Sequence, residues 1–179
     1  MTPLTHQCAV VLIPPEESWA PIQAIRRNHD RQFRRWMPHL TLLYPFLPRE
    51  AFAEIMPVLE HCCAGIPPFP VTLGQFRSFR HHGRRCTVWL APEPLEPWLA
   101  LHATLAAAFP DAAAAPKLPF EPHLSVGQAG RRELEALSTR LQADWRPIAF
   151  EAVAVSLIWR HDAPDDVFRI ERNFAFTRP

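Results

Sequence analysis

Short apolar runs alternate with amphipathic segments along the chain, and this pattern predicts a protein built from both strands and helices. The runs rich in β-branched and aromatic residues, which are typical of strands, span 7–13, 38–44, 70–77, 84–90, 121–127, 148–159 and 167–176. Apolar residues repeated every three or four positions predict helices over 16–28, from Pro48 onward, over 94–109 and after Gly130. Pro57 should kink or end the second of these helices early, because proline lacks the N–H group that a helix interior requires.

Two of the predicted strands begin with nearly the same five residues. The stretch 38–42 reads PHLTL and the stretch 122–126 reads PHLSV. A Pro-His pair alone would be expected by chance in a chain with 21 prolines and 9 histidines among 179 residues. The leucine, the small hydroxyl residue and the aliphatic residue that follow in both copies argue against coincidence. The repeat therefore indicates a duplicated structural unit.

The order of elements around the two motifs supports the same duplication. Each half of the chain contains a helix, a motif strand (38–44 or 121–127), a second helix and a pair of strands. We therefore predict an α+β fold in a single bilobal domain over 1–179, with pseudo-two-fold symmetry. In this fold, two antiparallel-rich sheets flank a central groove and the helices lie on the outside. The connection between the lobes is expected near 91–119, either at 91–94 or in the alanine- and proline-rich segment 110–119.

Side chains alternate across a strand, and this alternation gives each motif one polar and one apolar face. His39 and Thr41 share one face of the first motif strand, and the aliphatic residues between and after them face the core. His123 and Ser125 repeat the arrangement in the second motif strand. If the two lobes are related by a pseudo-two-fold axis, two imidazoles and two hydroxyls converge on one groove.

Two imidazoles and two hydroxyls suit acid–base chemistry on a phosphodiester. One histidine can activate the attacking oxygen while the other protonates the leaving oxygen, because the pKa of a free histidine lies near 6.5. The hydroxyls can donate hydrogen bonds to the non-bridging oxygens, where the transition state carries charge. This arrangement needs no metal, and the sequence contains no evident carboxylate cluster that would hold one.

The segments HLTLLYPF (39–46) and EPHLSVGQ (121–128) resemble the two signatures of the two-histidine phosphoesterase superfamily, which includes bacterial 2′-5′ RNA ligase-like proteins and cyclic nucleotide phosphodiesterases. The resemblance in element order covers nearly the whole chain. It implies hydrolysis of 2′,3′-cyclic phosphodiesters of RNA ends or nucleotides, without metal or other cofactor, leaving a 2′-phosphate. It also implies that His39 and His123 are the catalytic pair and that Thr41 and Ser125 bind the phosphate. Ser125 stands where threonine is common, and it keeps the hydroxyl.

Two other functions are compatible with the same motifs. The first is reversible 2′-5′ RNA ligation, which microscopic reversibility allows the same histidines to perform. The second is a non-catalytic module that binds nucleotides or RNA. In all three cases the expected partner is RNA or a nucleotide with a 2′,3′-cyclic phosphate or a 2′-5′ linkage. The structural alternative, in which both histidines only support their strands, is disfavoured by the repeated context.

Several residues near the motifs are weaker candidates. Tyr44 and Phe46 could stack on a base at the rim of the groove or pack in the core, and Tyr44 is the one retained as a binding residue. Arg77 and Arg160 hold matching places in the two halves and could contact phosphate, and the arginines within 26–35 could guide an RNA backbone. For these arginines, solvated surface positions are the favoured interpretation.

The cysteines and remaining histidines do not indicate a metal site or a disulfide framework. Strands 70–77 and 84–90 are expected to join through a turn at 81–83. His81 and His82 of this turn and Cys86 of the following strand match no standard zinc spacing. Neighbouring Cys62 and Cys63 are poorly placed for a disulfide framework.

Net charge and hydropathy limit the partners and the compartment that we expect for this protein. The net charge is +1, so there is no overall electrostatic attraction to nucleic acid or membrane. The first apolar run stops at Pro14 and is too short for a signal peptide, and no segment reaches the roughly 18 apolar residues that span a bilayer. We therefore expect a cytoplasmic monomer with no membrane partner.

Overall fold

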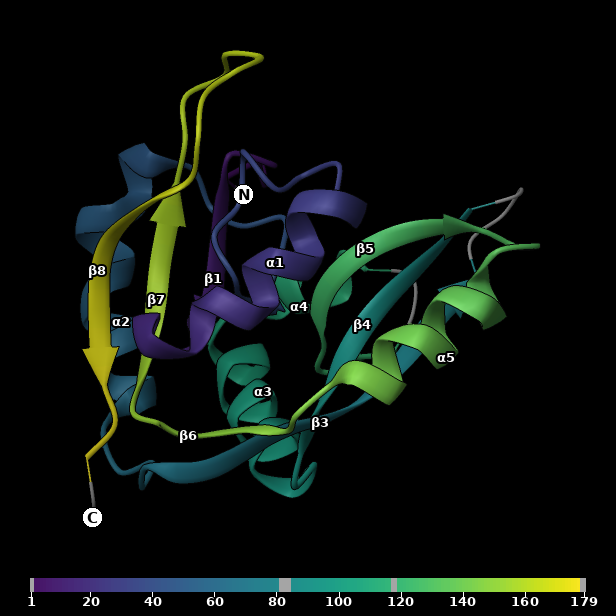
Figure 1. Ribbon diagram of the computed structural model, residues 1–179. Coiled ribbons are helices and arrows are strands. Elements are labelled where there is room, and N and C mark those ends of the chain that lie inside the picture. The colour runs from purple at the N-terminus through teal and green to yellow at the C-terminus, as the bar shows by residue number, and fades with distance from the viewer. Residues whose placement is uncertain (1, 81–84, 117–118, 178–179) are drawn as a thin grey trace.

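The computed structural model describes residues 2–80, 85–116 and 119–177, and it contains two four-stranded antiparallel sheets (Figure 1). The first sheet has the order β2–β1–β7–β8, with bounds Leu40–Leu43, Cys8–Leu12, Ala154–Trp159 and Arg169–Ala175. The second has the order β5–β4–β3–β6, with bounds Leu124–Gly130, Arg85–Glu93, Phe69–Arg80 and Ile148–Ala152. The predicted α+β class with two antiparallel sheets is confirmed.

Helices pack against both sheets and against each other. Their bounds are α1 Trp19–His29, α2 Phe52–Cys63, α3 Glu96–Ala108, α4 Pro110–Ala114 and α5 Leu134–Asp144, with short 3₁₀ turns η1 (Glu16–Ser18) and η2 (Arg49–Ala51) ahead of α1 and α2. Helix α1 contacts β5, α2 contacts β8 and α3, and α5 contacts β3, β4 and β5. In the described part of the chain, no helix is both long enough and apolar enough to cross a bilayer.

The two motif strands are the facing edges of the two sheets. Strand β2 pairs only with β1 in its sheet, and β5 pairs only with β4 in the other sheet. The two edge strands contact each other across the junction between the sheets. This contact brings together two segments from opposite halves of the sequence.

The segment 91–119, where the lobe connection was expected, instead joins two strands of the same sheet. Strands β3 and β4 come from the first half of the chain but belong to the sheet of the second motif strand, and β7 and β8 belong to the sheet of the first. The chain thus contains two topologically equivalent units, β1-α1-β2-α2-β3 and β4-α3-β5-α5-β7. The last strand of each unit belongs to the sheet that the other unit forms. The reason is hydrogen bonding: β3 completes its ladder on β4, and β7 completes its ladder on β1. The chain therefore crosses between the sheets before β3 and again between β6 and β7.

Three local predictions differ from the structure. The apolar run 148–159 forms two strands, because β6 pairs with β3 and β7 pairs with β1 in the other sheet, and exposed Val153 lies at the crossing. The segment 110–119 contains the short helix α4 rather than only a connector. Helix α2 passes through Pro57 and continues to Cys63, because the apolar face on both sides of the proline is buried in the core. The turn expected at 81–83 lies outside the described residues.

Burial fixes the register of both motif strands. Leu40, Leu42, Leu124 and Val126 are at most 4% exposed and belong to one hydrophobic cluster that runs through both sheets. A shift of one residue in either strand would turn these side chains toward solvent and the histidines toward the core. Each such exposure would cost about 1.5–3 kcal/mol, so burial of the aliphatic residues holds the polar residues on the opposite face.

Gly127 permits the close approach of α1 to β5. A Cβ atom at this position would lie 2.5 Å from the His29 Cβ and 3.0 Å from the His29 carbonyl oxygen. Because the backbone of His29 cannot give way as a flexible side chain would, we expect Gly127→Ala to lower the free energy of unfolding by about 1–3 kcal/mol. Urea denaturation measures this change.

Gly74→Ala is the matched control, because a Cβ there would meet its nearest neighbours at 3.9 Å. This substitution should change stability by no more than about 0.5 kcal/mol. Equal losses in the two variants would contradict the steric explanation.

Candidate active site

The four predicted polar residues occupy one face of the two edge strands. His39 and His123 immediately precede β2 and β5, and Thr41 and Ser125 are the second residues of these strands. All four are partly exposed, whereas the aliphatic residues that alternate with them are buried. The burial pattern agrees with the alternation expected from the sequence.

The two imidazoles lie close enough to interact electrostatically. Positive charge on His123 disfavours protonation of His39 and lowers the pKa of His39. Strands β2 and β5 contact each other as well. The fold therefore brings the two repeated histidines to one place.

Each histidine is held by the same hydrogen bond. The Nδ1 of His39 lies 2.7 Å from the carbonyl oxygen of Met37, and the Nδ1 of His123 lies 2.7 Å from the carbonyl oxygen of Glu121. A carbonyl oxygen only accepts hydrogen bonds, so Nδ1 must carry the proton in both rings. In the neutral ring, Nε2 then keeps its lone pair and can accept a proton.

An aromatic stack supports His39. Trp36 stacks on the imidazole with ring centres 4.5 Å apart and planes inclined by 19°. Phe168 lies 3.8 Å from Trp36, and Tyr44 meets Trp36 edge-on at 5.4 Å. These contacts limit rotation of the His39 ring.

A different aromatic pair surrounds His123. Phe79 meets the imidazole edge-on at 4.9 Å, and Trp89 meets it at 5.7 Å. Phe79 and Trp89 stack on each other at 4.8 Å. His123 thus rests against the strands β3 and β4 of its own sheet.

The surroundings lower the pKa of both histidines, with His39 the more affected. The pKa of His39 is lowered from 6.5 to about 4, mainly by burial and also by nearby Arg26 and His123, while the bond to Met37 and the Asp30 carboxylate oppose the shift. Burial also lowers the pKa of His123, and there the carbonyl and carboxylate of Glu121 oppose the shift. His39 is therefore neutral at pH 7 in the free protein and available as a base.

Tyr44 lies on the His39 side of the site, and Phe46 does not. The Tyr44 hydroxyl donates a hydrogen bond to the carbonyl oxygen of His6 at 3.3 Å, and its ring meets the His6 ring at 5.1 Å. Burial raises the pKa of Tyr44, so its hydroxyl stays protonated. Phe46 is fully buried and packs on Phe109, which rules it out as a stacking surface for a base.

Arg77 and Arg160 do not occupy equivalent places. In the second sheet, Arg77 pairs with Trp89, which pairs with Ser125. In the first sheet, Thr41 pairs with Val11, and Val11 pairs with Ser156. Ser156 therefore stands where Arg77 stands in the second sheet, because the register between β7 and β1 places it there. Arg160 instead follows β7 and donates to the carbonyl oxygen of His161. The sequence-based prediction that Arg77 and Arg160 hold matching places is therefore wrong.

The arginines within 26–35 do not form one surface patch. Arg26 is buried and paired with Asp30 at 2.9 Å. Arg35 donates to the carbonyl oxygen of Pro164 in the β7–β8 connection. The exposed arginines of this segment are Arg27, Arg31 and Arg34.

No metal site is evident among residues 2–80, 85–116 and 119–177, where no group of three or more His, Cys, Asp or Glu side chains could hold an ion. His81 and His82 lie outside this described part of the chain. Cys62 and Cys63 are both buried thiols, and burial raises the pKa of each.

The aromatic and polar neighbours of the histidines were missed by the sequence analysis. Trp36 could have been suspected, because it lies three residues before His39. Phe79, Trp89 and Phe168 reach the site only through sheet pairing and carry no local signal. Arg26 and Asp30 have the four-residue spacing of a helical ion pair, but such spacing is usually found on solvated surfaces.

Comparison with known proteins identifies related sequences and folds. The family model described as the 2′-5′ RNA ligase superfamily matches residues 14–164. A protein of Geobacillus kaustophilus with the provisional name phosphoesterase is 28% identical over 120 residues, covering 66% of this chain and 67% of that protein. The structure of TT0787 of Thermus thermophilus is similar with a TM-score of 0.66 at 21% identity, covering 96% of this chain and 98% of that one. Escherichia coli LigT complexed with 3′-AMP is similar with a TM-score of 0.63 at 16% identity, covering 98% and 100%.

The depressed pKa of His39 predicts a pH-dependent stability. Between pH 6.5 and about 4 the unfolded chain binds a proton at this residue and the folded protein does not. The free energy of unfolding should therefore fall as the pH is lowered through this window. Urea denaturation at several pH values, compared with His39→Gln, measures the effect. An unchanged pH dependence in the variant would show that His39 is not the group responsible.

Proposed function

The chain belongs to the 2′-5′ RNA ligase superfamily, and from this premise we propose that it hydrolyses 2′,3′-cyclic phosphodiesters of RNA ends or nucleotides without a metal ion. The observation that carries the proposal is the meeting of two imidazoles at the contact between β2 and β5, each bonded through Nδ1 to a backbone carbonyl, which leaves Nε2 as the nitrogen that can exchange a proton. One phosphodiester could be held between them.

The proposed reaction transfers two protons. Nε2 of neutral His39 accepts a proton from water as the water oxygen attacks phosphorus. Protonated Nε2 of His123 donates its proton to the 3′ oxygen as the bond from phosphorus to that oxygen breaks. The products are a 2′-phosphate and a free 3′-hydroxyl, and proton exchange with solvent restores both rings. Thr41 and Ser125 donate hydrogen bonds to the non-bridging oxygens.

The assignment of His39 as base and His123 as acid follows from their surroundings. Burial, Arg26 and His123 disfavour the protonated form of His39 and outweigh Met37 and Asp30, whereas at His123 the carbonyl and carboxylate of Glu121 oppose the effect of burial. The bound phosphodiester carries a negative charge and raises the pKa of both rings. The less depressed histidine then holds its proton at neutral pH, while the other remains a base.

The proposed ligand is of nucleotide size. Solved structures of E. coli LigT hold 3′-AMP in one case and NADP+ in another, which supports a similar ligand for a chain of the same fold. We propose that Tyr44 contributes to the wall beside the base, on the His39 side of the site.

Reversible 2′-5′ ligation is the second candidate, and the description of the matching family favours it. In this reaction the 5′-hydroxyl of a second RNA replaces water, and the same two proton transfers produce a 2′-5′ phosphodiester and a free 3′-hydroxyl. Incubation with RNA halves that carry a cyclic phosphate and a 5′-hydroxyl distinguishes ligation from hydrolysis. Tight AMP binding without turnover of any cyclic phosphate would instead indicate a binding module.

Removal of either imidazole tests the catalytic pair. We expect His39→Ala and His123→Ala each to lower kcat by at least about 10²-fold, because a general acid or base contributes roughly 10²–10⁴-fold. The assay uses 2′,3′-cyclic mononucleotides and cyclic-phosphate-ended oligonucleotides with EDTA present, and the wild-type rate should be unaffected by the chelator. His61→Ala, an exposed histidine on α2, is the control and should retain full activity. Retained activity in either catalytic variant, or loss to EDTA, would overturn the mechanism.

Removal of the Thr41 and Ser125 hydroxyls tests phosphate binding independently of proton transfer by the histidines. Thr41→Val and Ser125→Ala each remove one donor to the phosphate and should lower kcat/KM by about 10²- to 10³-fold, the range for loss of one transition-state hydrogen bond. Thr41→Ser keeps the hydroxyl and should restore most of the rate. If Thr41→Val and Thr41→Ser reduce activity equally, packing of the methyl group, and not the hydroxyl, is what matters.

A further inference from the structure

A buried ion pair lies beside the site, at the end of α1. Arg26 is 1% exposed and Asp30 is 9% exposed, and Nε of the arginine donates to Oδ2 of the aspartate at 2.9 Å. Removing two charges from water costs several kcal/mol per ion, and apolar residues of similar volume would often be as stable. The pair therefore needs an explanation beyond stability, and its other bonds provide one.

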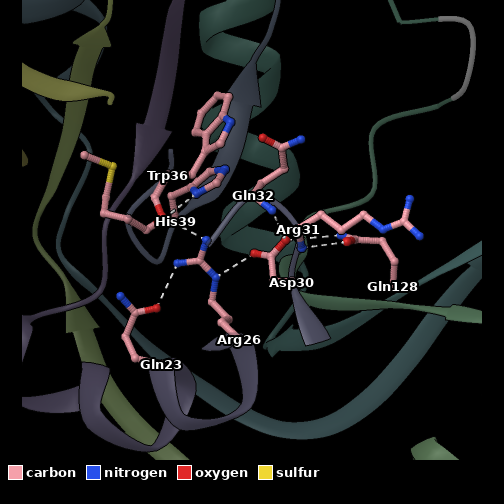
Figure 2. A network of polar contacts seen from close by, with 9 residues as sticks. Gln23, Arg26, Asp30, Arg31, Gln32, Trp36, His39 and Gln128 are labelled. Atoms are coloured by element: carbon pink, nitrogen blue, oxygen red, sulfur yellow. Dashed lines mark hydrogen bonds and ion pairs between the residues drawn. The ribbon is translucent and has the colours of Figure 1, made fainter. Parts of the chain in front are cut away.

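Arg26 ties α1 to the segment that carries His39. Its Nη1 donates to the side-chain oxygen of Gln23 at 3.0 Å, and its Nη2 donates to the carbonyl oxygen of Trp36 at 2.8 Å (Figure 2). Trp36 in turn stacks on His39. The guanidinium thus fixes the backbone three residues before the histidine, on the side of the supporting ring.

Asp30 ties the same segment to β5. Its Oδ1 accepts hydrogen bonds from the backbone N–H of Gln32 at 2.9 Å and from the side-chain amide of Gln128 at 3.2 Å. The side-chain oxygen of Gln128 accepts a bond from the backbone N–H of Arg31 at 3.0 Å. Gln128 belongs to the strand that follows His123, so these bonds connect the two motif segments (Figure 2).

We propose that Arg26, Asp30 and Gln128 form a clamp that positions His39 against His123 for reaction at a shared phosphorus atom. The three are positioning residues, since their hydrogen bonds act on the histidines through Trp36 and β5. The clamp rests on the proposed function for its purpose, but its geometry is independent of any substrate. It also explains why β5 and α1 approach so closely that only glycine fits at position 127.

The charges of the clamp act on His39 in opposite directions. The charged and titratable groups that act on this imidazole are Arg26 and Asp30 from the end of α1 and His123 from the second motif segment. Arg26 lowers the pKa of His39 and Asp30 raises it. Neutral amides at these positions should therefore shift the titration of His39 in opposite senses, whereas a general loosening of the site would shift it in the same sense in both variants.

The kinetic test compares Arg26→Gln, Asp30→Asn and Gln128→Ala with wild type on 2′,3′-cyclic nucleotides. Each should lower kcat by about 10- to 100-fold, because misplacement by about 1 Å can cost roughly 10²-fold, and KM should change less than threefold. The acidic limb of the pH–rate profile should move to higher pH in Arg26→Gln and to lower pH in Asp30→Asn. Arg26→Lys keeps the charge but not the fork of donors, so its kcat should fall without the upward shift.

The control is the exposed ion pair of Arg172 on β8 and Glu60 on α2, whose side chains are 3.0 Å apart. Strand β8 is the edge of its sheet opposite the motif strand β2. Arg172→Gln and Glu60→Gln should leave kcat and the pH profile unchanged. Thermal unfolding checks that each variant is folded. If loss of one charge prevents folding, Gln128→Ala still decides the question, because it leaves the ion pair intact and removes only the link to β5.

Histidine titration by NMR in the absence of substrate separates this inference from the proposed function. The ring signals of His39, assigned with His39→Gln, should titrate higher in Arg26→Gln and lower in Asp30→Asn than in wild type. If wild type hydrolyses no cyclic phosphate but these shifts occur, the proposed function fails, while the interaction of the clamp with His39 is supported. If wild type is active and Gln128→Ala keeps its kcat, or the two charge variants shift His39 in the same direction, the clamp is overturned.

Discussion

The contact between two edge strands is the constraint on which the site depends. Strands β2 and β5 each pair on one side only, and their unpaired edges meet where the two sheets join. Both strands bury aliphatic side chains on one face, so the opposite face must carry the imidazole and the hydroxyl of each motif. Because burial of the aliphatic residues sets the register, the polar residues are placed by the hydrophobic core rather than by contacts of their own.

The exchange of strands between the two units stabilises the contact between β2 and β5. Each sheet is completed by a strand from the other unit, so the two units are joined by backbone hydrogen bonds within each sheet and by a shared core as well as by loops. The units are nevertheless not identical in detail. His39 stacks on Trp36 beside a buried ion pair, whereas His123 meets two aromatic rings edge-on and interacts with Glu121. A duplicated scaffold with unequal surroundings thus lowers the pKa of His39 more than that of His123, which suits the acid–base pair that we propose.

The polar network at the end of α1 is a second interaction that positions the two motif segments. A hydrophobic core holds strands in register but allows small rotations of exposed rings, because dispersion forces have little directional preference. Hydrogen bonds from the guanidinium of Arg26 and the amide of Gln128 are directional and link the two motif segments. The site thus combines coarse placement by the core with fine placement by a buried polar bridge. Family membership, the fold and this geometry are consistent with one another, and each rests on a separate observation.

The sequence by itself determined the features that depend on neighbouring residues. The repeated motif, the alternation of faces around His39 and His123, and the mixture of helices and strands all follow from local spacing and were visible without coordinates. The tertiary structure decided which strands pair, because hydrogen-bond partners far apart in the chain compete for the same edges. For that reason the run 148–159 divides between two sheets, the predicted lobe connection joins strands of one sheet, and Arg77 and Arg160 lose their apparent equivalence. The burial of Arg26 was likewise decided by the packing of α1 on β5, which no local pattern records.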